Sequence, residues 1–381
     1  MLGNMTKSQG EGGSFFAKDA LSLENTRPLR MVLVIFIFTF HLTGHFGIGR
    51  DIGHVLVAVF FMLSGYGLMY SMDHKGGYLK SFLPKRFPTL YIPTVICGTA
   101  MVILSALVYP GYDYMKEFFE IFFLRPEWWF VTALMLLYMT FYLSFLFFRG
   151  RNAVIAVIIL SITFTLMLSE FTNDIIYYAS ISGFFVGILW YYGQDRIAPF
   201  MKKYYVVVFL ILVLLLVLSN VERDRIVGIK DLLLTNVAPL IFTLLLIVTI
   251  SAREKLAVVV IGFVLLMAIV VSVVKLEFPE VIYYEADILL FELFVLAALI
   301  RIPYLRQGLA IGSIVSFEIF LIHDYIFKMV IYSMSPDIYV TALIAGVSTV
   351  ILSIVLYFIS DRILKEYNKA FDRLGDNASQ R

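Results

Sequence analysis

The chain has 381 residues, of which 61% are hydrophobic and 15% are charged, and its formal net charge is +2. About a quarter of the residues in a soluble globular protein are charged, so this composition excludes an ordinary soluble enzyme and indicates a polytopic protein surrounded by membrane lipids. A net charge this close to zero gives no indication of a nucleic-acid partner.

Apolar stretches of about twenty residues, the length of a helix that crosses a membrane, follow one another along the chain. They lie at residues 31–48, 53–72, 88–109, 128–148, 153–170, 175–193, 204–219, 231–250, 256–274, 283–300, 308–329 and 339–360. The predicted fold is therefore an all-α integral membrane bundle of about twelve transmembrane helices, with ten or eleven as the alternatives.

Basic residues are concentrated in the loops that follow every second predicted span. Those loops contain Lys75, Lys80, Lys85, Arg86, Arg149, Arg151, Arg196, Lys202, Lys203, Arg253, Lys255, Arg301 and Arg306. Because short basic loops stay on the cytoplasmic side, this alternation predicts that both termini are cytoplasmic and that the number of spans is even.

The chain divides according to this topology. Residues 1–27 are polar and contain no long apolar segment, so we expect a cytoplasmic segment without a cleavable signal peptide. Residues 28–360 are predicted to form the membrane domain, and residues 361–381 a cytoplasmic tail. Cys97 is the only cysteine, which excludes an intrachain disulfide and a cysteine-based metal cluster.

The first span has a basic residue and a histidine at the two ends of an apolar run, RMVLVIFIFTFH. An offset of eleven residues separates Arg30 from His41 by roughly 16 Å along a helix and by only about 20° around it, so both lie on one face. We expect Arg30 at the membrane boundary and His41 near the middle of the hydrocarbon core, where an ionisable group is a functional hypothesis. His41 and His45 could bind zinc as an i, i+4 pair, but no third ligand is near in sequence and we expect no metal.

Two further patterns concern packing. Residues 110–127 mix aromatic and charged side chains, which predicts a helix in the outer interface, followed by Trp128 and Trp129 in the aromatic belt. Gly183 and Gly187 form a small-xxx-small pair, which predicts close packing against another helix.

Other polar groups lie within predicted spans. Ser64 is in the segment FFMLSGYGL, where a helix-packing role is the alternative to a functional one. Glu318 and His323, in SFEIFLIHDY, are five residues apart, about 140° around a helix, so they cannot both face one partner squarely. Glu292 and Asp287 in the tenth span leave a structural and a substrate-lining role equally open.

Five segments of the chain, taken in order, resemble the membrane acyltransferase-3 family. They are Arg30 and His41 with ten residues between them, FFMLSGYGL at 60–68, KRFPTLYIP at 85–93, PEWWFVTALMLLY at 126–138 and SFEIFLIH at 316–323. Each segment alone is a weak match, whereas five in the same order are fairly specific.

The resemblance implies an integral O-acyltransferase of a bacterial cytoplasmic membrane. Such an enzyme passes an acyl group, often acetyl, from cytoplasmic acyl-CoA to a hydroxyl of a glycan or lipid-linked saccharide. His41 is then the expected catalytic base. Arg30, Lys85 and Arg86, at the cytoplasmic ends of the first three spans, are expected to bind the phosphates of acyl-CoA. We further expect Ser64, Gly65, Glu318 and His323 to line the substrate site.

A secondary transporter or glycan exporter is the alternative from another class. Its intramembrane groups, His41, Glu292, Glu318 and His323, could form a proton relay. Transporters commonly contain related halves with broken helices at matching positions, and the sequence shows neither. Association with further copies of the chain is left open.

Overall fold

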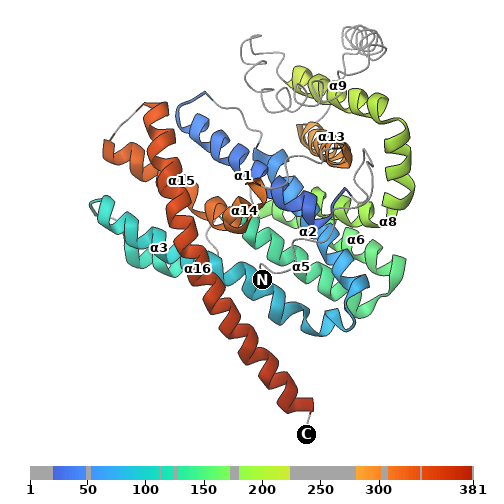
Figure 1. Ribbon diagram of the computed structural model, residues 1–381, viewed down its shortest axis with the longest axis horizontal. Helices are drawn as coiled ribbons and strands as arrows, with labels where there is room; N and C mark the ends of the chain where they lie inside the picture. The colour runs from blue at the N-terminus through green and yellow to red at the C-terminus, as the bar shows by residue number, and fades with distance from the viewer. Residues whose placement is uncertain are drawn as a thin grey trace.

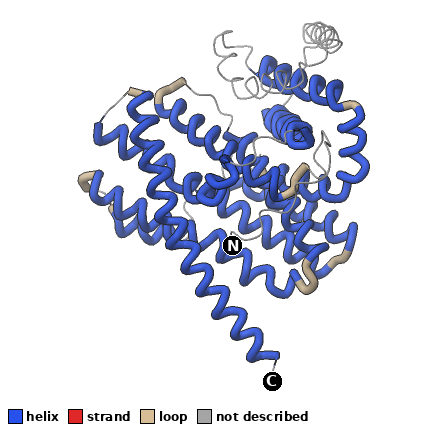
Figure 2. The backbone as a smooth tube through the Cα atoms, in the orientation of Figure 1, coloured by secondary structure: helices blue, strands red, loops and turns tan. Residues whose placement is uncertain are grey.

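The computed structural model describes residues 20–48, 53–111, 113–122, 128–171, 180–223, 280–301, 308–334 and 337–379. Every regular element in these ranges is a helix, as Figure 2 shows. The predicted all-α fold is therefore confirmed. The predicted spans at 231–250 and 256–274 lie outside the described residues.

The long helices correspond to the other predicted spans in chain order (Figure 1). They are α1 (Leu23–His45), α2 (Gly53–His74), α3 (Phe82–Val108), α5 (Trp129–Phe147), α6 (Gly150–Phe171), α8 (Ser182–Lys203), α9 (Tyr205–Arg223), α13 (Glu280–Arg301), α15 (Ser316–Met334) and α16 (Ile338–Ser379). The short elements are η1 (Tyr78–Ser81), α4 (Tyr114–Phe122), α14 (Gly308–Gly312) and η3 (Ser313–Val315).

Several of these helices are long and apolar enough to cross a membrane. Among the described residues, α1, α2, α3 with η1, α5 and α16 meet this condition, and the bent pair of α8 and α9 makes a sixth candidate. Helix α15 is not among them, and it contains Glu318, Asp324 and Lys328 within 19 residues. The chain is thus a multi-pass membrane protein, whereas twelve spans and cytoplasmic termini stay predictions.

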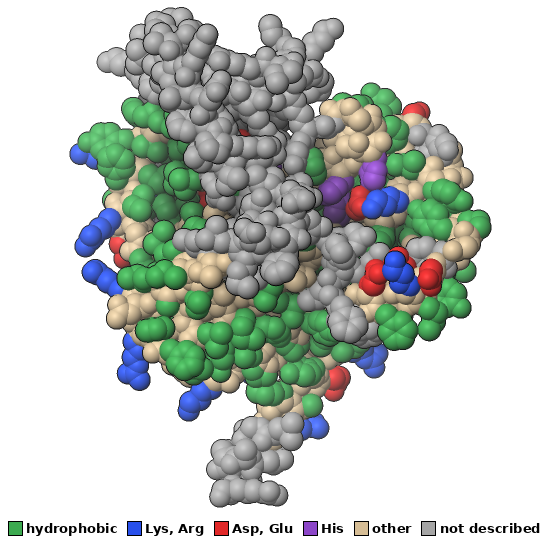
Figure 3. Space-filling model, turned by 180° about the vertical axis from the view of Figure 1, so that it is seen from behind, with side chains coloured by type: hydrophobic (Ala, Val, Ile, Leu, Met, Phe, Trp, Pro, Cys, Tyr) green, Lys and Arg blue, Asp and Glu red, His purple; other side chains and the backbone are tan. Residues whose placement is uncertain are grey.

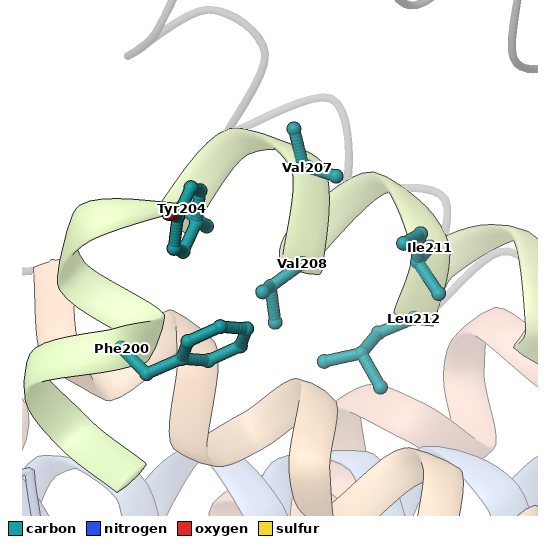
Figure 4. A pocket seen from close by; sticks show the side chains of 6 residues that line it. All are labelled: Phe200, Tyr204, Val207, Val208, Ile211 and Leu212. Carbon is teal, nitrogen blue, oxygen red and sulfur yellow. The ribbon is translucent and has the colours of Figure 1, made fainter. Parts of the chain in front are cut away.

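Helices α8 and α9 meet at an angle of 98°. The two were predicted as separate spans at 175–193 and 204–219, but helices this close to perpendicular cannot both follow the membrane normal. The bend is at Tyr204, the residue between the two helices, and Pro199 lies inside the last turns of α8. Its inner side is an apolar groove of about 380 Å³ (Figure 4), lined by Phe200, Tyr204, Val207, Val208, Ile211 and Leu212.

Glycines bring α2 and α8 into close contact. A Cβ atom on Gly187 would overlap the carbonyl oxygen of Met62, and one on Gly65 would overlap that of Phe184. Gly183 likewise lies against the backbone of α2. The predicted packing role of Gly183 and Gly187 is confirmed, because only residues without a Cβ allow the two backbones to approach this closely.

The first and last helices extend beyond their predicted bounds. Helix α1 begins at Leu23, before the predicted start of the span, and ends at His45; Asn25 and Thr26 in its first turn are buried within the bundle. His41 lies about one turn from the end of α1, and its depth in the membrane stays a prediction. At the other terminus, α16 continues without a break through most of 361–381. Its 42 residues span roughly 63 Å, and its C-terminal part projects away from the bundle in Figure 1.

Trp128 differs from its predicted place in an aromatic belt. Its side chain is only 2% exposed, and its indole N–H points to the carbonyl oxygen of Leu321 at 3.4 Å. The ring covers Gly98, where any Cβ would collide with it. Trp128 thus joins α3 to α15 inside the bundle. The segment before it contains the helix α4, and the place of α4 at a membrane interface stays a prediction.

Candidate functional site

One polar cluster lies where α1 and α15 pack together. It consists of His41 and His45 from α1 and His323, Asp324 and Lys328 from α15, and we call it the histidine cluster. Within α1, His41 and His45 lie on one face, and within α15, Asp324 and Lys328 do, because positions four apart lie above one another on a helix. Histidine side chains reach the surface beside an acidic and a basic side chain on the face drawn in Figure 3.

Asp324 is the acidic centre of this cluster. Its Oδ1 lies 2.8 Å from Nε2 of His45 and 3.8 Å from Nδ1 of His41, while its Oδ2 accepts a hydrogen bond from Nζ of Lys328 at 2.7 Å. Two helices thus hold one carboxylate from several directions. The side chain of His41 is 40% exposed and that of Asp324 is 27% exposed, so outside molecules can reach both.

His323 lies beneath His41. The two rings are 4.9 Å apart in an edge-on arrangement, and His323 is only 3% exposed. Nδ1 of His323 faces the carbonyl oxygens of Ile319 and Phe320 at 3.0 and 2.8 Å, so this nitrogen must carry the proton. Nε2 is then an acceptor, and it has no hydrogen-bond partner among the described residues.

A second polar cluster lies near the other end of α1. Arg86 donates from Nε to the hydroxyl of Tyr78 at 2.8 Å and from Nη2 to Oγ of Ser71 at 3.4 Å. Buried Tyr138 lies within electrostatic range of Arg86 and Arg30. We call Arg30, Arg86, Tyr78 and Tyr138 the arginine cluster.

No carboxylate in the described part of the chain neutralises the positive charge of the arginine cluster. Within the part of the chain that the structure describes, neither Arg30 nor Arg86 forms an ion pair with a carboxylate, and the two cations lie within electrostatic range of each other. Arg30 is exposed. Two nearby cations without a counter-charge form a ready site for a polyanion.

Lys85 is in a different situation from the two arginines. Its Nζ lies 2.9 Å from Oδ1 of Asp372 and 5.9 Å from the ring centre of Phe371, both on the C-terminal part of α16. The lysine is 44% exposed and the aspartate 59% exposed. Of the three predicted phosphate ligands, Lys85 alone has an acidic partner among the described residues.

The structure brings some predicted substrate-lining residues to these clusters and leaves others apart. The Ser64 hydroxyl donates to the carbonyl oxygen of Phe60 at 2.9 Å and is hydrogen-bonded to Tyr138, so it borders the arginine cluster. Gly65, its neighbour, is taken up by packing against α8. His323 belongs to the histidine cluster, as described above.

Glu318 lies on α15, five residues before His323. It is only 3% exposed, its Oε2 has no hydrogen-bond partner among the described residues, and it lies near Cys97 on α3. Glu292 and Asp287 are buried on α13, and Glu292 fills the space beside Gly183. No group of three or more histidine, cysteine or acidic residues in the described ranges is arranged to hold a metal ion.

Sequence reasoning missed four residues of these clusters, Asp324, Lys328, Tyr78 and Tyr138. Asp324 directly follows His323 and precedes Lys328 by four residues, a spacing that predicts an ion pair on one helix face. That signal was available, whereas the approach of α1 was not. Tyr138 stands in an apolar run, where nothing in the sequence separates a buried functional hydroxyl from a packing ring.

Comparison with known proteins assigns the chain to a family. No protein of curated function and no solved structure matches it. A family model described as an acyltransferase domain matches residues 28–263, more than half of the chain, and that match includes Arg30, His41 and Arg86. Helix α15, with His323 and Asp324, follows the matched region. The chain therefore belongs to the acyltransferase-3 family and is a multi-pass membrane acyltransferase.

Proposed function

We propose that this protein transfers an acyl group, most simply acetyl, from cytoplasmic acyl-CoA to a hydroxyl of a glycan or lipid-linked saccharide in a bacterial cytoplasmic membrane. One observation carries the proposal. A single helix, α1, contributes to an unbalanced cationic cluster near one end and to a histidine and carboxylate cluster at the other. The first suits a polyanionic donor, and the second suits removal of a proton from a hydroxyl.

The donor would bind through its phosphates to Arg30 and Arg86, with Lys85 assisting. An arriving phosphate relieves the repulsion between the two guanidinium groups and gains charged hydrogen bonds, each worth about 1.5–3 kcal/mol. Tyr78 accepts a hydrogen bond from Arg86 and so fixes the direction of the guanidinium plane. Arginine suits this task better than lysine because its planar fork matches two phosphate oxygens.

The acyl group would then reach His41. The offset along α1 is roughly 16 Å, a separation that the pantetheine arm of acyl-CoA can bridge when extended. The neutral imidazole accepts the proton of the acceptor hydroxyl, the oxygen forms a bond with the thioester carbonyl carbon, and the carbon–sulfur bond breaks. The departing CoA thiolate takes up the proton, so the products are an ester and CoA.

The position of His41 favours an acceptor on the side opposite to the donor. His41 lies one turn from the end of α1 that is distant from Arg30, and its side chain is open to solvent. Ser64, which borders the arginine cluster, and Glu318, on the same helix as His323, would line the path of the acyl chain. Gly65 is left out of this path because α8 occupies its free side.

The transporter alternative gains nothing from these observations. The family assignment is to acyltransferases, and α8 and α9 form the one bent pair of span candidates among the described residues. Related broken helices at matching positions in two halves would have favoured transport.

The test is a stoichiometric one. The purified protein in detergent is incubated with acetyl-CoA that is labelled in the acetyl group, together with an extract of membrane glycolipids and glycans. We expect one CoA released for each acetyl group that becomes alkali-labile in the extract. If protein that is folded and monodisperse in detergent yields neither product, the function is rejected. Uptake of the glycan into proteoliposomes without CoA release would establish the transporter.

A further inference from the structure

The carboxylate of Asp324 is shared by side chains from two helices. Lys328, four residues along α15, binds one oxygen at 2.7 Å. The other oxygen is 2.8 Å from His45 and 3.8 Å from His41, both on α1. Because both oxygens are engaged, the carboxylate group cannot rotate freely, and its position relative to α1 is fixed.

This arrangement has a chemical consequence for His41. A neutral imidazole carries one proton, which can be on Nδ1 or on Nε2, and the hydrogen bonds or charges near one nitrogen decide which. Nδ1 of His41 is the nitrogen that faces Asp324. A negative charge on that side favours the proton on Nδ1 and leaves the lone pair on Nε2.

We propose that Asp324 is a positioning residue that acts through His41, holding the proton on Nδ1 so that Nε2 carries the lone pair that accepts the proton of the acceptor hydroxyl. The proposal rests on the proposed function, in which His41 is the base. The separation of 3.8 Å exceeds hydrogen-bond length, and a shift of about 1 Å would close it. Catalytic hydrogen bonds are often long in an enzyme without substrate and shorten when the substrate binds.

The surroundings of His41 support this assignment. The ring of His323 approaches edge-on from below, and Phe40 approaches from the side with ring centres 4.9 Å apart. These contacts restrict the imidazole to a small range of orientations while its exposed side stays open. His45 and Lys328 hold the carboxylate, and Asp324 in turn faces the base.

The first arm of the test separates turnover from donor binding. Asp324→Asn keeps the size of the side chain and removes its charge, so kcat should fall by at least about tenfold, and by no more than the roughly 10²–10⁴ that the positioned base itself contributes. The KM for acetyl-CoA should change by less than about twofold, because the phosphates bind roughly 16 Å away along α1. The control Asp337→Asn, at the start of α16, should behave like wild type because asparagine also caps helices.

Further variants separate Asp324 from its neighbours. Asp324→Glu restores the charge and should recover part of the lost kcat. His45→Gln should cost less than Asp324→Asn, because Lys328 still holds the carboxylate. If Asp324→Asn turns over within twofold of wild type, or if His45→Gln abolishes turnover while His41→Gln does not, the proposal is overturned.

The second arm does not depend on acyl transfer. Solid-state NMR of protein labelled with ¹⁵N-histidine distinguishes protonated from unprotonated ring nitrogens, and the signals of His41 are those that vanish in His41→Gln. Wild type should show Nδ1 protonated, and Asp324→Asn should move proton occupancy to Nε2. An unchanged His41 spectrum overturns the proposal even if acyl transfer is confirmed. A changed spectrum supports it even if wild type releases no CoA, which would reject only the function.

Discussion

The two polar clusters along α1 differ in their balance of charge. The arginine cluster has two guanidinium groups, two tyrosine hydroxyls, and no carboxylate paired with either arginine in the described part of the chain. The histidine cluster has one carboxylate surrounded by three nitrogen bases. A cluster with excess charge is incomplete until an anion arrives, whereas a balanced one already holds its charges in place and can redistribute protons.

This difference fits the two roles proposed along α1, donor binding at the arginine cluster and proton transfer at the histidine cluster. Groups that bind a donor need to be unpaired, because a carboxylate nearby would compete with the phosphate. A base needs a fixed neighbour, because its orientation and its tautomer decide the rate.

The two clusters should face opposite sides of the membrane. Lys75 follows α2 near the arginine cluster, and Lys116, 67% exposed, lies on α4 at the other end of α3. In a Cys97→Ala background, Lys116→Cys should react with an impermeant maleimide in intact cells, while Lys75→Cys should react only after lysis. The reverse pattern would place the arginine cluster outside, where cytoplasmic acyl-CoA cannot reach it.

His41 should be required for turnover and nearly dispensable for folding. Loss of a positioned base costs about 10²–10⁴ in rate, so His41→Gln should reduce acetyl transfer by that factor. Its side chain is 40% exposed, so we expect the melting temperature in detergent to stay near that of wild type. His74→Gln is the matched control, because His74 is exposed and bonds to the carbonyl oxygen of Tyr70 in its own helix. If His41→Gln turns over at more than about a tenth of the wild-type rate, His41 is not the base, and His323 is the next residue to test.

The sequence allowed prediction of the all-α fold class and of two residues in each cluster, Arg30 and Arg86 in the arginine cluster and His41 and His323 in the histidine cluster. Arg30 and His41 could be found because helical periodicity alone decides that residues eleven positions apart share a face. Asp324 and Tyr138 could not, since their roles depend on which helices become neighbours. The 98° bend between α8 and α9 at Tyr204 could not be predicted for the same reason. Apolar length predicts that a segment is helical, but the direction of a helix depends on its packing partners.

Arg86 should matter mainly for donor binding. Arg86→Ala removes charged hydrogen bonds worth about 1.5–3 kcal/mol, so the KM for acetyl-CoA should rise roughly ten- to a hundred-fold with a smaller change in kcat. Arg86→Lys should recover part of this loss if charge outweighs fork geometry. Arg151→Ala, at an exposed position at the start of α6, is the control for general loss of positive charge. A normal KM in Arg86→Ala would refute the donor-binding assignment.

Tyr138 should contribute a smaller amount to the same site. Tyr138→Phe keeps the buried ring and removes the hydroxyl that is bonded to Ser64 and lies near both arginines. A hydrogen bond of this kind contributes about 0.5–1.5 kcal/mol, which corresponds to a rise in KM of up to about tenfold. A lower melting temperature with an unchanged KM would instead assign the hydroxyl to packing, and the arginine cluster would then consist of Arg30, Arg86 and Tyr78.

The smallest effect concerns the ion pair between Lys85 and Asp372. Exposed pairs contribute about 0.2–1 kcal/mol, so Asp372→Ala should release Lys85 and lower the KM for acetyl-CoA by at most about fivefold. Asp361→Ala is the matched control, because it removes an ion pair with Lys365 from the same helix without touching Lys85. The gain from Asp372→Ala should vanish at high salt, since screening already weakens an exposed pair. A raised KM would mean that Asp372 helps to place the lysine for the donor, and the part of α16 beyond the bundle would then belong to the donor site.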